Sequence, residues 1–322
     1  MKLTHPKLGD GLLANLIIAG AGRSGTTSLF RYLADHPSVC ASSAKEVHFF
    51  DKMPPEGLNH ESLKRYESYF RHCSPDIPVR VEATAGYLYG GRRTAEAIRS
   101  AIPHVKLIFI LREPINRAFT VFRKSRTGEP ETFQGLSFDD FVAIGLDGEH
   151  AEHNAKTHGR AEKIVGRLMQ GCYVQFLSEY FAVFPPEQIC VLFFDDFAKD
   201  VRSVMLKVVE FLCIDPHFYD SYTFHVENRT RSYRIALLHR FANRLNMKLE
   251  RMLNRYPAGR RSLRKIYNKF NERRNQGDQI SELARQRLQK FYEPYNRELY
   301  VLLKQQVPNA RLPEWIMSAR DG

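Results

Sequence analysis

The stretch IIAGAGRSGTT, at residues 17–27, constrains the fold of this 322-residue chain more than any other. Its apolar start predicts a buried strand, and the glycines that follow predict a tight turn leading into a helix. Such a turn points backbone N–H groups and the positive end of the helix at a bound anion. The sequence therefore predicts a phosphate-binding loop between a strand and a helix.

The same alternation of apolar strand and amphipathic helix continues through the first two-thirds of the chain. Strands are expected at residues 15–20, 79–83, 105–111 and 189–194, and helices at 26–35, 61–73, 92–101, 114–126, 172–184 and 201–212. Pro114 at a first helical turn and the capping pattern Ser137-x-x-Asp140 support two helix starts. This pattern predicts an α/β fold, a parallel sheet flanked by helices.

The character of the chain changes after about residue 228. Residues 229–274 contain fifteen Lys or Arg and only two acids, with apolar residues recurring at three- and four-residue spacing. This spacing predicts a basic amphipathic helix, and a final helix is expected over 280–305. We expect one domain over residues 1–322, with 229–322 as a basic helical extension.

The charge and the cysteines predict the surroundings of the chain. A formal net charge of +12 favours anionic partners, and the 229–274 segment would allow peripheral contact with a membrane. The longest apolar stretch near the start is too short to span a bilayer and lacks the features of a secretory signal. Five scattered cysteines without a C-x-x-C pair predict neither a disulfide framework nor a zinc site. Free cysteines predict a cytoplasmic location.

The phosphate loop departs from the nucleoside-triphosphate pattern G-x-x-x-x-G-K-[ST]. Gly20 and Gly25 fit that pattern, but the lysine position holds Thr26. A kinase uses that lysine on the β- and γ-phosphates, so its absence weighs against phosphoryl transfer. The nearby cation is Arg23, inside the loop, which indicates a shorter anion chain with a fixed charge near its end.

A second anion site is predicted where the strand at 105–111 ends. Arg112 stands there in place of the acidic residue that would hold magnesium, at the sheet edge where ligands of open α/β folds bind. A guanidinium at this point implies a further phosphate, and Thr120 could add a hydroxyl donor. The alternative is that Arg112 pairs with Glu113 or another acid at a helix start.

Together these motifs resemble the sulfotransferases that use 3′-phosphoadenosine-5′-phosphosulfate, most closely the bacterial members and the Golgi heparan-sulfate branch. The loop is similar to their 5′-phosphosulfate loop, and Leu111-Arg112-Glu113-Pro114 with Thr120 is similar to their 3′-phosphate motif. The stretch KEVHFFD, at residues 45–51, resembles the branch's K/G-E-x-H-F-F-D motif, and GCYVQ, at 171–175, resembles another family segment. The resemblance assigns donor binding to Gly22, Arg23, Ser24, Gly25, Thr26, Thr27, Arg112 and Thr120.

Three departures from the family pattern matter. Arg23 replaces the usual lysine, and Thr120 replaces a serine. The Golgi branch's E-K-T-P segment reads Glu82-Ala83-Thr84-Ala85, so its lysine is absent. The late glycine-rich basic loop over the 3′-phosphate is not recognisable, and we assign its role to Arg229 and Arg231.

The resemblance implies sulfuryl transfer to a hydroxyl or amine of a glycan, a glycolipid or a small metabolite, with adenosine 3′,5′-bisphosphate as the product. Glu46 would be the general base, the alternative being a surface glutamate paired with Lys45, and His48 is the competing base. Lys45 would either contact the sulfuryl group or be solvated, and Arg23 would stabilise charge on the departing phosphate. No metal is required by this chemistry.

Two other functions remain open from the sequence alone. One is a nucleotide or small-molecule kinase, which the missing loop lysine disfavours. The other is a non-catalytic module that binds an anionic polymer or a membrane through residues 229–274. No nucleic-acid motif is recognisable, so we expect no nucleic-acid partner.

Overall fold

The computed structural model describes residues 12–52, 58–147, 155–225, 232–233, 272–273 and 279–320. The predicted helix within 229–274, and with it Arg229 and Arg231, lies outside these residues except for two short strands. These are β6 (Ser232–Tyr233) and β7 (Glu272–Arg273), which pair antiparallel.

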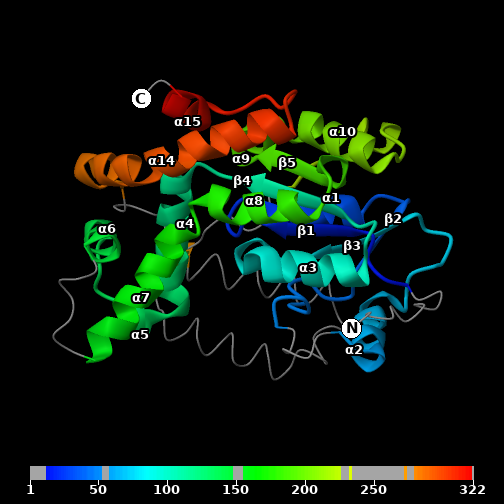
Figure 1. Cartoon of the computed structure of the whole chain (residues 1–322), viewed down its shortest axis with the longest axis horizontal. Coiled ribbons are helices and arrows are strands. Elements are labelled where there is room, and N and C mark those ends of the chain that lie inside the picture. Colours follow the sequence, from blue (N-terminus) through cyan, green and yellow to red (C-terminus); the bar gives the residue numbers. More distant parts are fainter. Residues whose placement is uncertain are drawn as a thin grey trace.

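A five-stranded parallel sheet forms the centre of the molecule, with strand order β2-β3-β1-β4-β5 (Figure 1). Its strands are β1 (Leu16–Gly20), β2 (Val39–Ala41), β3 (Val79–Ala83), β4 (Lys106–Leu111) and β5 (Ile189–Phe193). The four predicted strands are confirmed to within one residue. The prediction missed β2, a three-residue edge strand too short to show a pattern.

Helices cover both faces of this sheet. They are α1 (Thr26–Ala34), α2 (His60–Glu67), α3 (Gly91–Ala101), α4 (Pro114–Gly128), α5 (Pro130–Phe133), α6 (Phe138–Leu146), α7 (Ala155–Met169), α8 (Tyr173–Val183), α9 (Phe194–Lys199), α10 (Val201–Leu212), α14 (Glu282–Gln306) and α15 (Glu314–Met317). The predicted parallel sheet flanked by helices is confirmed. The helix expected over 61–73 is shorter, because a 3₁₀ turn at Ser68–Phe70 replaces its last part.

Side chains of β1 alternate between two apolar layers, as the pleat requires. Ile17 and Ala19 point into the layer under α3 and α8, while Leu16 and Ile18 point into the layer under α1 and α10. All of β1 is buried, so its end at Gly20 is fixed from both sides.

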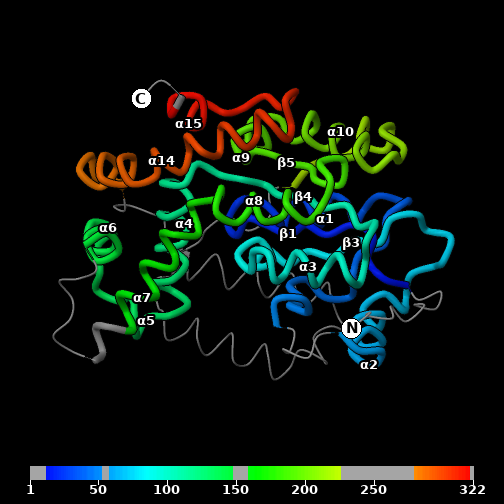
Figure 2. Tube along the Cα trace, in the orientation of Figure 1, coloured from blue at the N-terminus to red at the C-terminus, as the bar shows by residue number. Residues whose placement is uncertain are grey.

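A third apolar cluster joins α4, α6 and α7 to α14. Figure 2 shows these helices gathered at one end of the molecule, with α14 crossing from them toward α8 and α9. This cluster therefore fixes α14 against α4, the helix that follows β4. Within the described residues, we find no helix that is both long enough and apolar enough to cross a membrane.

The expectation of five free cysteines is wrong, because Cys40 and Cys73 form a disulfide. They are 33 residues apart, and their Cα atoms are 5.8 Å apart. The tertiary path brings Cys73, after the 3₁₀ turn, beside the edge strand β2, and no sequence spacing could indicate this. Disulfides persist in oxidising compartments, so the cysteines no longer support a cytoplasmic location.

Candidate active site

The predicted phosphate loop joins β1 to α1 at the carboxyl edge of the sheet. Gly20 is required there, because a Cβ atom at this position would lie 2.6 Å from the Cβ of Leu88. Arg23 (φ 70°) and Gly25 (φ 96°) both have left-handed backbone conformations, and Gly25 begins α1 without a side-chain cap. Within the described residues no side chain caps the first turn of α1, which is the arrangement that binds anions.

The other loop residues assigned to the donor differ in how far they face solvent. Ser24 and Thr26 are buried, whereas Gly22 and Thr27 are half-buried. The N–H of Gly22 donates to the hydroxyl of Tyr89 at 3.2 Å. The phosphate loop is thus hydrogen-bonded to Tyr89, which the sequence analysis did not identify as a site residue.

The structure brings Arg23 and Arg112 together, although they are 89 residues apart. The guanidinium of Arg112 donates to the carbonyl of Arg23 at 3.2 Å and lies over the Phe194 ring, 4.4 Å from its centre. Burial lowers the pKa of both guanidinium groups, and Arg23 further lowers the pKa of Arg112. Two desolvated cations at one helix N-terminus would be stabilised by a polyanion.

Among the described residues no acid forms a direct ion pair with Arg112, although the charges of Asp195 and Glu113 act to raise its pKa. Glu113 instead has a capping role. Its carboxylate caps α4 by accepting from the N–H of Asn116 at 2.7 Å, and burial raises its pKa. It also lines a cavity of about 300 Å³ with Arg285 and Trp315, between α4, α14 and α15.

Tyr173 fixes the backbone of Arg112. Its hydroxyl donates to the Arg112 carbonyl at 2.7 Å and lies 3.3 Å from the Arg112 N–H, which donates to it. Tyr173 belongs to the GCYVQ stretch, so the sequence marked this segment without giving it a role. Because its hydroxyl both donates to and accepts from the backbone of Arg112, the buried Tyr173 holds the end of β4 rigidly.

Thr120 and Lys124 lie one helical turn apart on α4. The hydroxyl of Thr120 donates to the Asn116 carbonyl at 2.8 Å, so it would have to rotate to reach a phosphate. The pKa of Lys124 is lowered, first by desolvation and then by the positive charge of Arg23. Lys124 is therefore a cation near the loop that sequence analysis missed, although its i+4 spacing from Thr120 could have indicated it.

The KEVHFFD stretch forms a loop beside the end of β3, and its shape depends on two left-handed residues, Glu46 (φ 58°) and His48 (φ 53°). The N–H of Glu46 donates to the Ala83 carbonyl at 2.8 Å. One carboxylate oxygen of Glu46 accepts from the N–H of Ala85 at 3.1 Å, and the other accepts from the ammonium of Lys45.

The apolar residues Phe49 and Phe50 of this stretch would suggest a partly enclosed turn, but Glu46 is not buried. Phe49 and Phe50 are 6% and 2% exposed and pack inward against Tyr66. The Glu46 side chain is 39% exposed. The two rings anchor the loop to the core instead, through their contacts with Tyr66.

His48 is oriented by a carboxylate. Its Nδ1 lies 2.6 Å from an Asp51 oxygen, and its Nε2 lies 3.9 Å from a Glu46 oxygen. A Cβ atom at Gly86 would come within 3.3 Å of both His48 and Asp51, so this glycine makes room for the pair. With Nδ1–H donated to Asp51, Nε2 is left on the side of Glu46, which is the geometry of an oriented base.

Residues 84–90 contact both loops. Tyr89 accepts from the phosphate loop at Gly22, while the hydroxyl of Tyr87 accepts from the N–H groups of Phe49 and Phe50 at 3.0 and 3.4 Å. The same hydroxyl donates to buried Glu82 at 2.7 Å. Residues 84–90 therefore fix the position of the phosphate loop relative to the Glu46 loop.

Glu82 accepts from three hydroxyls, those of Tyr66, Thr84 and Tyr87. Burial raises its pKa, while these hydrogen bonds act in the opposite direction. The next residue, Ala83, stands where the Golgi branch has its lysine and is fully buried. The described part of this segment thus supplies positioning hydroxyls rather than a cation.

The sequence model of the family described as "Sulfotransferase domain" matches residues 13–301. This chain belongs to that family. Among the functions that the sequence left open, family membership supports the sulfotransferase and gives no support to a kinase.

Two human proteins named for heparan sulfate are similar to this chain. Bifunctional heparan sulfate N-deacetylase/N-sulfotransferase 3 is 25% identical over 218 residues, covering 64% of this chain and 23% of that protein. Heparan sulfate glucosamine 3-O-sulfotransferase 3B1 is 26% identical over 221 residues, covering 66% of this chain and 50% of that protein. The chain thus spans about a quarter of the first protein and half of the second.

A solved structure shows the same fold. The crystal structure of a sulfotransferase from Alicyclobacillus acidocaldarius superposes with a TM-score of 0.60, covering 94% of this chain and 99% of that one. The two sequences are 20% identical. The likeness therefore concerns the fold, the P-loop-like sulfotransferase fold with its helix-flanked parallel sheet.

Proposed function

We propose that this sulfotransferase moves a sulfuryl group from 3′-phosphoadenosine-5′-phosphosulfate to a hydroxyl or amine of its acceptor. The observation that carries this proposal is the convergence of Arg23 and Arg112 at the uncapped N-terminus of α1. Two desolvated guanidinium groups beside helix amides that no described side chain caps suit a donor with phosphates at two positions.

We assign the two ends of the donor to the two cations. The loop amides and Arg23 would hold the 5′-phosphosulfate, and Arg112 would hold the 3′-phosphate with its guanidinium backed by Phe194. Lys124 would add charge near Arg23. Arg229 and Arg231 stay proposals for the 3′-phosphate, since they lie outside the described residues.

Transfer requires a new bond between the acceptor oxygen or nitrogen and sulfur while the bond from sulfur to the 5′-phosphate breaks. Arg23 and the α1 amides would stabilise the charge that develops on the leaving phosphate. Glu46 would take the acceptor's proton, and Lys45 would orient Glu46 or contact the sulfuryl group. His48, held by Asp51, is the alternative base on the same side.

We infer an anionic acceptor from the net charge of +12 and from the two relatives named for heparan sulfate. A sulfated or acidic glycan suits this charge, as would a lipid-linked one. Peripheral contact with a membrane through residues 229–274 stays a proposal.

Calorimetry with adenosine 3′,5′-bisphosphate in excess EDTA tests the donor assignment. We expect binding without magnesium, because Thr26 stands where a kinase has its loop lysine and Arg112 stands where it has its metal-binding acid. ATP, which lacks a 3′-phosphate, should bind much more weakly. Absence of bisphosphate binding, or equal binding of ATP, would end this proposal.

A further inference from the structure

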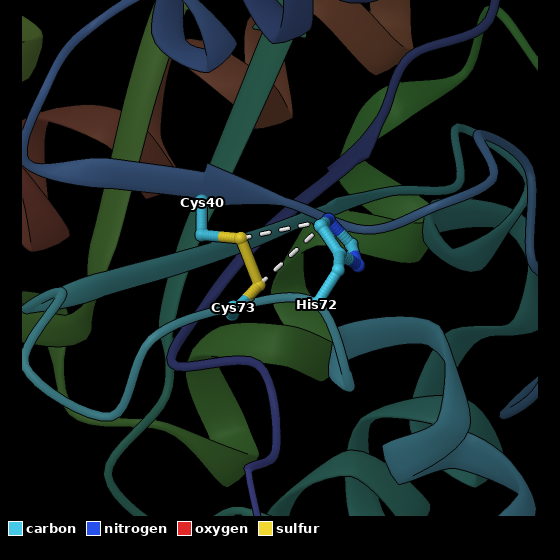
Figure 3. A group of neighbouring side chains, drawn as sticks. All are labelled: Cys40, His72 and Cys73. Atoms are coloured by element: carbon cyan, nitrogen blue, oxygen red, sulfur yellow. Dashed lines mark hydrogen bonds between the residues drawn. A yellow bond between two sulfur atoms is a disulfide. The ribbon is translucent and has the colours of Figure 1, made fainter.

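Cys40, His72 and Cys73 form a compact cluster that the proposed reaction does not use. The Nε2 atom of His72 lies 3.6 Å from the sulfur of Cys40 and 3.9 Å from that of Cys73, beside the disulfide (Figure 3). Within the part of the chain that the structure describes, this is the one group of three such side chains placed closely enough to share a metal ion.

Two thiolates and one imidazole are a donor set typical of zinc. With Zn–S near 2.3 Å and Zn–N near 2.0 Å, a tetrahedral site has nitrogen–sulfur edges of about 3.6 Å and a sulfur–sulfur edge of about 3.8 Å. His72 already lies at such distances from both sulfurs. After reduction, only the separation between the two sulfurs must increase, and their Cα atoms, 5.8 Å apart, are well placed for it.

The backbone around the cluster is held independently of the disulfide. Cys40 lies in β2, paired with β3, and Cys73 closes a turn by donating its N–H to the Phe70 carbonyl at 2.9 Å. The N–H of Ser43 donates to the Tyr69 carbonyl at 2.9 Å, which ties the end of β2 to this turn. The three side chains should therefore stay close when the sulfur–sulfur bond opens.

Exposure leaves one coordination position open. Cys40 and Cys73 are 9% and 5% exposed, whereas His72 is exposed. A water molecule could thus complete a tetrahedron on the His72 side. Nε2 of His72 also lies 3.0 Å from the Ala41 carbonyl, so metal binding requires the imidazole proton to move from that bond to Nδ1.

We propose that Cys40, His72 and Cys73 form a redox-gated site for a zinc-type divalent cation. A dithiol reductant delivers two electrons and two protons, breaks the disulfide and gives two thiols. The cation then displaces both thiol protons and is bound by two thiolates and the imidazole. A small-molecule disulfide that takes two electrons from the thiolates and two protons from solvent, and is itself reduced to thiols, re-forms the Cys40–Cys73 bond, which removes two of the three ligands and releases the cation.

Titration of the full chain with Co²⁺ tests the proposal, because thiolate–cobalt coordination has a strong charge-transfer absorption. Protein reduced with dithiothreitol and freed of it under nitrogen should bind one Co²⁺ per chain with this absorption, and Zn²⁺ should displace it. The untreated disulfide form should show none. His72→Gln should weaken binding by about 10-fold or more, while Cys213→Ser, an exposed thiol outside the cluster, should change nothing.

Three outcomes would overturn the proposal. They are the absence of the absorption in the reduced chain, equal Co²⁺ binding by the disulfide form, and unchanged affinity in His72→Gln. The His72 variant keeps both cysteines and the disulfide, so it stays informative even where Cys40→Ser fails to fold. None of these readouts depends on sulfotransferase activity.

Discussion

The two loops of the candidate site are built differently. The donor loop (residues 20–27) is shaped by its own glycines and by main-chain bonds to its neighbouring strand, such as Ala21 N–H to the Ile110 carbonyl at 2.9 Å. The base loop (residues 42–51) depends on distant side chains, above all Tyr87. Leu88 and Tyr89 also contact the donor loop, so a change at Tyr87 should disturb the base loop more than the donor loop and separate the two.

The largest effect is expected from Glu46→Gln, which tests the chemistry of the base loop. The amide keeps an oxygen for the Ala85 N–H but cannot accept the acceptor's proton. We expect kcat to fall by about 100-fold or more, with donor affinity little changed. Steady-state kinetics and calorimetry with adenosine 3′,5′-bisphosphate measure the two quantities separately.

His48→Gln is the matched control for that prediction. It disturbs the contact with Asp51 in the same loop and should reduce kcat clearly less. A nearly normal rate in Glu46→Gln together with an inactive His48→Gln would transfer the role of base to the histidine.

Arg112→Ala tests the donor side and should have the second largest effect. Loss of a buried charged hydrogen-bond donor should weaken donor binding by roughly 10- to 100-fold, with acceptor KM little altered. Adenosine-5′-phosphosulfate lacks the 3′-phosphate and should be nearly indifferent to the change. Equal losses for both nucleotides would mean that Arg112 supports the fold near Tyr173 instead.

The same contrast explains what the sequence could predict. The donor loop was recognisable because a strand, glycines and a helix start are consecutive in the sequence. Arg112 was recognisable because it directly follows an apolar strand, β4, which pairs with β1. The role of Tyr87 was not predictable, since its contact with Phe49 spans 38 residues. The Cys40–Cys73 bond likewise depends on tertiary contacts that no local pattern records.

Tyr87→Phe should separate positioning from chemistry. It removes the hydroxyl that accepts from Phe49 and Phe50 and donates to Glu82, leaving a buried carboxylate with one donor fewer. We expect kcat to fall by about 10-fold and the free energy of unfolding by about 1–3 kcal/mol. Donor affinity, measured by calorimetry, should stay unchanged.

Tyr219→Phe is a control of similar burial on the other face of the sheet. Its hydroxyl donates to the Tyr32 carbonyl, so its loss should destabilise the fold without changing kcat. An equal fall of kcat in both variants would show that general destabilisation, rather than the base loop, limits the rate.

The smallest effect concerns Lys124, at the edge of the donor loop. Its pKa is lowered from 10.5 by desolvation and by Arg23, so the free enzyme loses this charge at lower pH than an ordinary lysine would. Donor phosphates favour the charged form, so binding takes up protons once the pH approaches this lowered pKa. Donor affinity should therefore fall as the pH rises through that range toward 10.5. Lys124→Met should weaken donor binding only about two- to five-fold at neutral pH, because the Lys124 side chain as a whole is exposed and solvent screens part of its charge. It should also flatten the alkaline fall in affinity, whereas Lys64→Met, on α2, should leave that fall in place. An unchanged pH profile in Lys124→Met would remove Lys124 from the donor site and leave Arg23 and Arg112 as its proposed cations.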